Sequence, residues 1–224
     1  MNIVITGANR GIGLALTKAY LSQGARVFAL CRTTSEALSA TTAEVIEGID
    51  VSDDSALATL AEHLKQTLGS GESIQVLINN AGILTNESLG AMDFEAIAEQ
   101  ININSIAPLK VTAALLPLLS KGSKIGLVTS RMGSHTDNSS GGYYGYRMSK
   151  AALNSAGVSL AQDLKPHGIA VALLHPGFVQ TDMVGGAGDI PPETAADGLI
   201  KRLEELSLSN TGGFWHSNGE QLPW

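Results

Sequence analysis

The sequence is poor in several of the residues that build specialised classes of protein. It has one cysteine, Cys31, so an internal disulfide framework and a thiol-based metal cluster are excluded. It has 14 Lys and Arg residues and 21 Asp and Glu residues, which gives a net charge of -7. This charge argues against a nucleic acid or an anionic membrane as the main partner. Aromatic residues make up 4%, and no window reaches the roughly 18 apolar residues that cross a bilayer. With no leader-like N-terminus, these absences favour a soluble protein of the reducing cytoplasm.

The length and the hydrophobic pattern predict the fold. The 224 residues, 44% of them hydrophobic, are enough for one globular domain over residues 1–224, although two small ones are not excluded. Apolar strand-like runs are expected at residues 2–6, 26–30, 44–49, 73–78, 125–128 and 169–174, with an edge strand near Phe214. Helical segments alternate with them, at residues 14–21, 54–68, 94–119 with bends near its prolines, 146–164 and 192–206. This alternation predicts an α/β Rossmann fold, a doubly wound, mostly parallel sheet of about seven strands with helices on both faces.

A glycine-rich loop, TGANRGIG at residues 6–13, lies between the first strand and the first helix. Its glycines allow a tight turn and a close approach of the backbone to a ligand, and a helix N-terminus attracts a pyrophosphate. The spacing is G-x-x-x-G-x-G rather than G-x-G-x-x-G, and a purely structural turn is the alternative. Its position favours dinucleotide binding. The loop residues expected to hold the dinucleotide are Gly7, Asn9, Arg10, Gly11, Ile12 and Gly13.

The end of the second strand indicates which dinucleotide is bound. An acidic residue there would accept the ribose 2′-hydroxyl of NAD, whereas an arginine accommodates the 2′-phosphate of NADP. The sequence has Cys31 and Arg32 at this position, and Arg10 lies in the glycine loop. Two cations without a competing carboxylate could hold the extra phosphate, although both could also be ordinary surface arginines. We therefore predict NADP(H), with NAD(H) less favoured.

A serine, a tyrosine and a lysine gather within residues 130–150. Ser130 follows the apolar run 125–128, so it lies where a parallel strand ends and a crevice opens. Tyr146 and Lys150 are four residues apart in a helical segment, which places both side chains on one face. A nearby ammonium favours the phenolate, so Tyr146 is a candidate general acid or base whose pKa is lowered toward working pH. Alone, such a pair is more often an ordinary surface pair, and the other motifs decide.

Taken together, the motifs resemble the short-chain dehydrogenase/reductase family over nearly the whole chain. They are, in order, TGxxxGxG at residues 6–13, NNAG at 79–82, a helix asparagine at Asn104, Ser130, the YxxxK pair of Tyr146 and Lys150, and PGxVxTDM at 176–183. Each motif is modest, but all of them in this order are highly specific. The segments NINSIAPLK and YYGYRMSKAALN and the terminal LPW are most similar to the compact branch of sniffer-type carbonyl reductases and C-factor signalling proteins.

The resemblance implies a catalytic role for four residues. Tyr146 would donate a proton to a carbonyl during reduction, or act as the base in alcohol oxidation. Lys150 would hold the nicotinamide ribose and lower the pKa of the tyrosine, and Ser130 would hydrogen-bond the substrate oxygen. Asn104 would fix a water that links Lys150 to solvent. Asn102 competes for this last role, and the SIAP that follows Asn104 favours Asn104.

The resemblance also implies the remaining contacts to the cofactor. Asp50 and Val51, after the third strand, would contact the adenine. The other cofactor-binding residues that it implies are Asn80, Ala81 and Gly82 in the region of the adenosine ribose, Val179 and Thr181 at the carboxamide, and Pro176 and Gly177 beside them.

The sequence therefore favours an NADP(H)-dependent oxidoreductase that interconverts a carbonyl group and an alcohol. The alternative is an NADP(H)-binding signalling or regulatory factor whose catalysis is secondary, but the intact serine, tyrosine and lysine set favours an enzyme. The segment 181–193 is short and glycine-rich, which predicts a small lid and an open pocket that tolerates varied aldehydes and ketones. The family suggests a dimer through the long helices. His135 and His175 have no second ligand at metal spacing, so no metal is expected.

Overall fold

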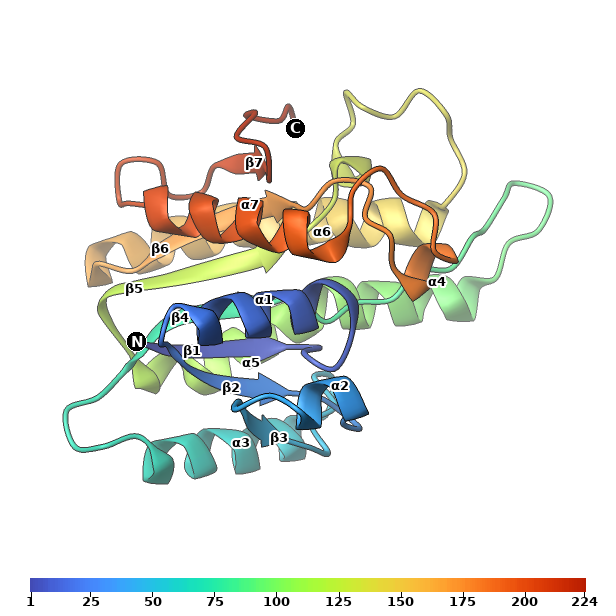
Figure 1. Ribbon diagram of the computed structural model, residues 1–224. Helices are drawn as coiled ribbons and strands as arrows, with labels where there is room; N and C mark the ends of the chain where they lie inside the picture. Colours follow the sequence, from blue (N-terminus) through green and yellow to red (C-terminus); the bar gives the residue numbers. More distant parts are fainter.

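The computed structural model describes residues 1–224, and one seven-stranded sheet runs through it in the order β3-β2-β1-β4-β5-β6-β7 (Figure 1). The strands are β1 (Asn2–Thr6), β2 (Arg26–Leu30), β3 (Glu44–Ile46), β4 (Ile74–Asn79), β5 (Leu119–Val128), β6 (Ala170–His175) and β7 (Phe214–His216). The helices are α1 (Gly11–Ser22), α2 (Glu36–Ser39), α3 (Asp54–Thr67), α4 (Phe94–Ile101), α5 (Ala107–Leu115), α6 (Tyr144–Leu164) and α7 (Pro192–Glu205). Every neighbouring pair of strands is parallel, so the predicted doubly wound α/β fold is confirmed.

Helices cover both faces of the sheet, and each face has its own apolar core. On one face α1 packs against α7 and β1, and α7 packs against β5 and β6, through buried side chains such as Leu16 and Leu203. On the other face α3, α5 and α6 bury leucines such as Leu60, Leu115 and Leu153 in one cluster with side chains of β1, β2, β4, β5 and β6. Strands buried on both faces explain the continuous apolar runs in the sequence.

Several boundaries differ from the predicted ones by a few residues. The strands β1 and β2 have the predicted limits, whereas β3 ends at Ile46 rather than at residue 49, because the chain turns at Gly48, which has a φ of 74°. Residues 119–124 extend β5 at its start, with a register shift against β4 between Ile74 and Val76. The short helix α2 was not predicted, since its four residues show no hydrophobic period.

The long helical stretch is interrupted by a π-helical turn, Asn102–Ile106, which separates α4 from α5 just before Pro108. An interruption or bend near this proline was predicted. By length and composition alone, Phe94–Leu118 could cross a membrane. This helix was not expected from the sequence, because it contains no uninterrupted apolar window of the required length. A core helix passes the same test, and here α4 packs against α6 and α5 packs against α3.

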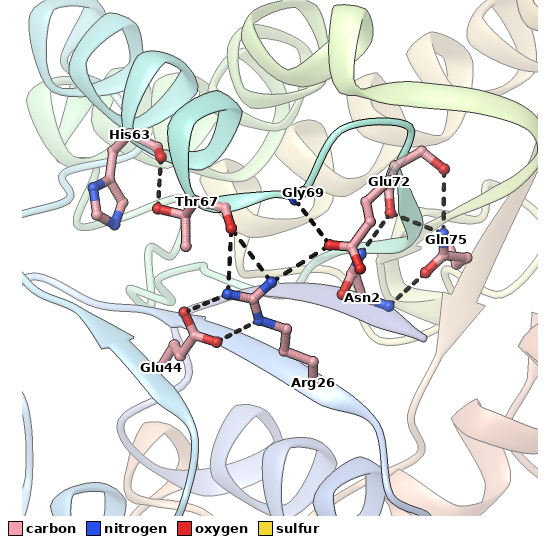
Figure 2. A network of polar contacts seen from close by, with 9 residues as sticks. Asn2, Arg26, Glu44, His63, Thr67, Gly69, Glu72 and Gln75 are labelled. Carbon is pink, nitrogen blue, oxygen red and sulfur yellow. Dashed lines mark hydrogen bonds and ion pairs between the residues drawn. The ribbon is translucent and has the colours of Figure 1, made fainter.

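Arg26 ties the amino-terminal edge of the sheet to α3 (Figure 2). Its guanidinium donates to the two carboxylate oxygens of Glu44 on β3, at 2.5 and 3.2 Å, and to the carbonyl of Thr67 at the end of α3, at 3.4 Å. A carboxylate oxygen of Glu72, which precedes β4, lies 3.6 Å from a guanidinium nitrogen of Arg26. The centre of the Phe28 ring lies 4.8 Å from the guanidinium carbon. The hydrogen bond to Glu44 holds the pKa of Arg26 above its usual value. This network joins β2, β3 and α3 at the edge opposite the predicted site.

Replacing Arg26 with Met should lower the free energy of unfolding by about 1–2 kcal/mol, because a two-pronged, partly buried ion pair is lost while the packing of the side-chain stem is kept. Urea denaturation measures this loss. The control is Lys65→Met, which removes an exposed ion pair with Glu62 at 3.8 Å and should change stability by less than about 0.5 kcal/mol. Equal losses in the two variants would show that the Arg26 network does not stabilise this edge.

Candidate active site

A cavity of about 1450 Å³ opens at the carboxyl edge of the sheet. Residues that follow β1, β4, β5 and β6 line it, and it lies over β1 and β4, where the strand order reverses. Such a switch point is where ligands bind in open α/β sheets. The wall includes every site residue predicted from the sequence except Gly13 and Asn104, which support wall residues from behind.

The glycine loop leaves the N-terminus of α1 free to bind an anion. Gly7 and Gly11 have φ values of 65° and 51°, in the left-handed region that favours glycine. A Cβ atom on Gly13 would overlap the carbonyl oxygen of Gly7, so Gly13 allows close packing beneath the turn and does not face the ligand. Arg10, the N-cap residue, makes no capping hydrogen bond with its side chain, so the first N–H groups of the helix have no side-chain partner there.

The hydroxyl of Thr6 belongs to the site, although the sequence did not single it out. It accepts hydrogen bonds from the backbone N–H groups of Asn80 and Ala81, at 2.9 and 3.0 Å. The side-chain amide of Asn80 in turn donates to the carbonyls of Thr6 and Gly7, at 3.0 and 3.2 Å. These bonds join β1 to β4 just beyond their ends. The amide of Asn80 therefore holds the glycine loop, whereas the prediction placed it against the ribose.

Arg10 and Arg32 both lie on the cavity wall, as expected for a 2′-phosphate site. Arg32 is exposed. Arg10, however, pairs with Asp182 at 3.5 Å, so the expectation that it has no competing carboxylate is wrong. The chain after β6 folds back over the glycine loop and brings this acid close. Asp50 has its pKa held below the usual value, chiefly by hydrogen bonds from the hydroxyl and N–H of Ser52 at 2.7 and 2.9 Å, with a smaller effect of Arg32.

Ser130, Tyr146 and Lys150 lie on one wall of the cavity. Ser130 follows β5, and its buried hydroxyl oxygen accepts the N–H of Met132 at 3.1 Å. Tyr146 and Lys150 lie one turn apart on α6, and the lysine Nζ is 5.6 Å from the centre of the tyrosine ring. The same Nζ donates to the carbonyl of Val128 at 3.0 Å. The three polar side chains that the sequence grouped are thus brought together, with Lys150 anchored to the end of β5.

Burial sets the protonation of this pair. It raises the pKa of Tyr146 to about 12, against a lowering effect of the hydrogen bond with Ser130. It lowers the pKa of Lys150 to about 8. The prediction that the pKa of Tyr146 is lowered toward working pH is therefore wrong for the protein's own groups, because desolvation disfavours the phenolate, and the effect of Lys150 on the tyrosine stays a prediction. These groups alone keep the phenol protonated.

Asn104 is completely buried in the π-helical turn between α4 and α5. Its side chain binds both backbone groups of Ile83, each at 2.8 Å, and donates to the hydroxyl of Ser149 at 3.0 Å. It therefore fixes the chain after β4 against α6, one residue before Lys150. Both of its N–H groups are used, and the water-binding role stays a prediction. Asn102, the competing candidate, is half-buried at the start of the same turn.

The other end of the cavity is partly apolar and has two histidines. Phe178 and Met183 expose their side chains at its mouth. His175 is buried at the end of β6, and its ring meets that of His216 edge-on at 4.8 Å. Burial lowers the pKa of His175 to about 3, so the imidazole is neutral, and its Nδ1 atom has no hydrogen-bond partner. The sequence predicted a strand-end histidine, but not that it lines the cavity.

The residues present fit a dinucleotide. The cavity is long enough to run from Arg32 to Tyr146, and a helix N-terminus without a side-chain cap opens into it. A Cβ on Gly7 would stand 3.0 Å from the Cα of Ala81, so a glycine there lets the loop pack closely against the chain after β4. Arg32 and Asp50 provide polar groups at one end, and the serine, tyrosine and lysine do so at the other.

The comparisons with known proteins agree with this geometry. The family model described as short chain dehydrogenase matches residues 1–189. The chain is 38% identical to 1-hydroxy-2-glutathionyl-2-methyl-3-butene dehydrogenase of Rhodococcus sp. (strain AD45), covering 99% of both chains, and 44% identical over 67% of its length to the C-signal of Myxococcus xanthus, covering 93% of that protein.

Solved structures are similar over the whole chain. Carbonyl reductase Sniffer of D. melanogaster has a TM-score of 0.92 at 31% identity, covering 100% of this chain and 99% of that one. The NADPH-bound carbonyl reductase from chicken fatty liver has a TM-score of 0.91 at 30% identity, covering 100% and 98%.

The buried lysine predicts a pH dependence of stability. Since the pKa of Lys150 falls from 10.5 to about 8 on folding, the unfolded chain binds the extra proton between these values, and stability rises with pH across that window. The free energy of unfolding of the wild type, minus that of Lys150→Met, should therefore increase by about 2–3 kcal/mol from about pH 7.5 to about pH 10. Denaturant titrations at several pH values measure the difference. The exposed Lys201→Met is the control of equal charge change, and the same profile for both variants would refute the prediction.

Proposed function

The chain belongs to the short-chain dehydrogenase family, and from that premise we propose that it is an oxidoreductase that interconverts a carbonyl group and an alcohol with NADP(H). The observation that carries the proposal is that Ser130, Tyr146 and Lys150 share one wall of a cavity whose other end is the glycine loop. A pure binding module needs the loop but not these three side chains. Their position in a cavity at the carboxyl edge of the sheet supports a proton donor beside a reacting carbonyl.

In this proposal each side chain has a task set by its surroundings. NADPH, when bound, would supply the hydride that adds to the carbonyl carbon. Tyr146 gives its proton to the carbonyl oxygen, and the raised pKa keeps that proton in place beforehand. Ser130 donates a hydrogen bond to the same oxygen and so orients the substrate. Lys150, held by the Val128 carbonyl, stabilises the phenolate that remains. In alcohol oxidation the phenolate takes the proton back.

The preference for NADP(H) over NAD(H) rests on Arg32 and Arg10. An exposed arginine follows β2 at the place where an acidic residue would bind the ribose of NAD. Arg10 would add a second cation once it leaves Asp182, and this exposed ion pair is weak. The NADPH-bound relative from chicken supports the same choice.

The substrate side favours varied aldehydes and ketones. The exposed Phe178 and Met183 make the mouth of the cavity apolar and open to solvent. The Rhodococcus relative is named for an alcohol with a glutathionyl group, which an open pocket could also admit. The dimer and the cytoplasmic location stay predictions from the sequence.

A second candidate function has one observation in its favour. The 44% identity to the C-signal of Myxococcus xanthus suggests a factor that binds NADP(H) for signalling, with catalysis secondary. The two candidates differ in one measurement. A panel of carbonyl compounds followed at the absorbance of NADPH shows turnover for the enzyme, and binding without turnover for the signalling factor.

The variant Tyr146→Phe should lower turnover by about 1000-fold, because it removes the group proposed to give its proton to the substrate oxygen. Its dissociation constant for NADPH, measured by fluorescence titration, should stay within about 2-fold of the wild type, since one hydroxyl is lost and the glycine loop is intact. Tyr144→Phe, two residues earlier on α6 and outside the cavity wall, is the matched control and should keep wild-type activity. Near-normal turnover in Tyr146→Phe would reject the assigned role.

The variant Arg32→Ala should raise KM for NADPH by about 10–100-fold and leave KM for NADH nearly unchanged, since a charge-assisted bond to the 2′-phosphate is lost. Steady-state kinetics with both cofactors provide the comparison. If the wild type prefers NADH, or if the variant affects both cofactors equally, Arg32 does not select the phosphate.

A further inference from the structure

The first turn of α6 carries Tyr146 but has no capping group of its own. The helix begins at Tyr144, which makes Tyr146 its third residue. The residue before it, Tyr143, has a left-handed backbone with φ of 50°, and its side chain makes no capping hydrogen bond. The first N–H groups of a helix need partners from outside the helix, and an uncapped first turn frays. The phenol proposed to react therefore lies on the part of α6 that is least held by the helix itself.

Glu87 supplies the missing cap from a distant segment. This residue lies in the loop 80–93 between β4 and α4 and is 2% exposed. Its carboxyl Oε2 accepts the N–H of Gly145 at 3.1 Å, across 58 residues of sequence. Its backbone carbonyl accepts the N–H of Tyr143 at 2.9 Å. Two N–H groups at the start of α6, one of them adjacent to Tyr146, are thus bound by one residue of another element.

The carboxyl group of Glu87 is itself held firmly. Its Oε1 accepts the amide of Gln100 at 2.9 Å and the hydroxyl of Thr85. Gln100, completely buried on α4, also accepts the N–H of Thr85 at 3.1 Å. None of the protein's ion pairs includes Glu87. A buried carboxyl group without a cation is costly, and here the partial positive charge of the α6 N-terminus and the neutral donors compensate it.

Gly145 in the first turn of α6 is packed closely against α4. A Cβ at this position would overlap the amide nitrogen of Gln100 and stand 3.0 Å from the Cα of Ile97. The start of α6 therefore presses directly on α4, through the same glutamine that holds Glu87. The position of Tyr146 above the cavity is fixed by this contact and by the Glu87 bonds together.

We propose that Glu87 is a positioning residue for the reaction: it caps α6 from outside and holds the Tyr146 hydroxyl at the height at which it meets the substrate oxygen. The inference rests on the proposed function, because its catalytic consequence requires Tyr146 to be the proton donor. A displacement of about 1 Å in a reacting group can cost about 100-fold in rate, so a cap on this turn acts on kcat. The glycine loop and Arg32 do not depend on Glu87, so the binding of NADPH does not.

The test compares Glu87→Gln and Glu87→Ala with Asp53→Ala. Asp53 caps α3 through the N–H groups of Ser55 and Ala56, so its loss removes a cap of the same kind away from α6. Hydrogen exchange of the amides at residues 144–147 should quicken about 10-fold or more in the Glu87 variants and stay unchanged in Asp53→Ala. The kcat for a reactive aldehyde should fall about 10–100-fold in the Glu87 variants only, with KM for NADPH within about 2-fold of the wild type.

Glu87→Gln keeps the side-chain volume and guards against loss of the fold in Glu87→Ala. Unchanged exchange at residues 144–147 in Glu87→Gln, or faster exchange with an unchanged kcat, would overturn the inference. A rise in KM for NADPH equal to the fall in kcat would also overturn it, because the effect would then be general. If the wild type reduces no carbonyl compound, the proposed function fails by itself, and the exchange rates still decide whether Glu87 holds the turn.

Discussion

The common direction of the strands is the constraint on which the site depends. Because all neighbouring pairs in the sheet are parallel, the carboxyl ends of β1, β4, β5 and β6 meet at one edge. Thr6 is the last residue of β1, and Asn80, Ser130 and Pro176 follow the ends of the other three strands, so this geometry brings them together from distant parts of the sequence. An antiparallel strand would carry its residues to the opposite edge, where Arg26 and its partners join the strand starts. The direction and order of the strands therefore determine where the cavity lies, and the side chains determine what it can bind.

Buried polar side chains surround the part of the molecule that carries the proposed chemistry. Glu87, Asn104, Lys150 and Asn154 are buried on or beside α4, α5 and α6, although Thr17 on α1 shows that the other face also buries a polar side chain. Each must be hydrogen-bonded to be tolerated, and Asn154 still has an unpaired amide nitrogen. Burying such groups is costly. The polar groups are retained there because α6 carries the side chains proposed to react, and their supports must lie within reach of it.

The sequence predicted the parts of the molecule that local patterns control. The apolar runs placed β1 and β2 correctly, and the glycine spacing and the Tyr146–Lys150 pair located the cavity wall. It could not predict what depends on the folded surroundings. The raised pKa of Tyr146 results from desolvation, and the Arg10–Asp182 pair results from a segment that folds back after β6. Glu87 lies in the polar run TNESLG, which reads as a surface loop until Gln100 and Gly145 are brought against it.

Desolvation raises the pKa of Tyr146 and lowers the pKa of Lys150, and these opposite shifts affect how the pair can work. With a pKa of about 12, Tyr146 keeps its proton over any ordinary range of pH, so it ionises only if a cation compensates the phenolate. Lys150, with a pKa of about 8, lies close to the point at which small changes around it decide its charge. In the proposed reaction, the charge state of this neighbour one turn away would therefore set how readily the phenol ionises. The helix fixes the two side chains relative to one another, and the proposed cap fixes the first turn of the helix relative to the sheet. The phenol and the ammonium therefore keep one geometry in which this dependence acts.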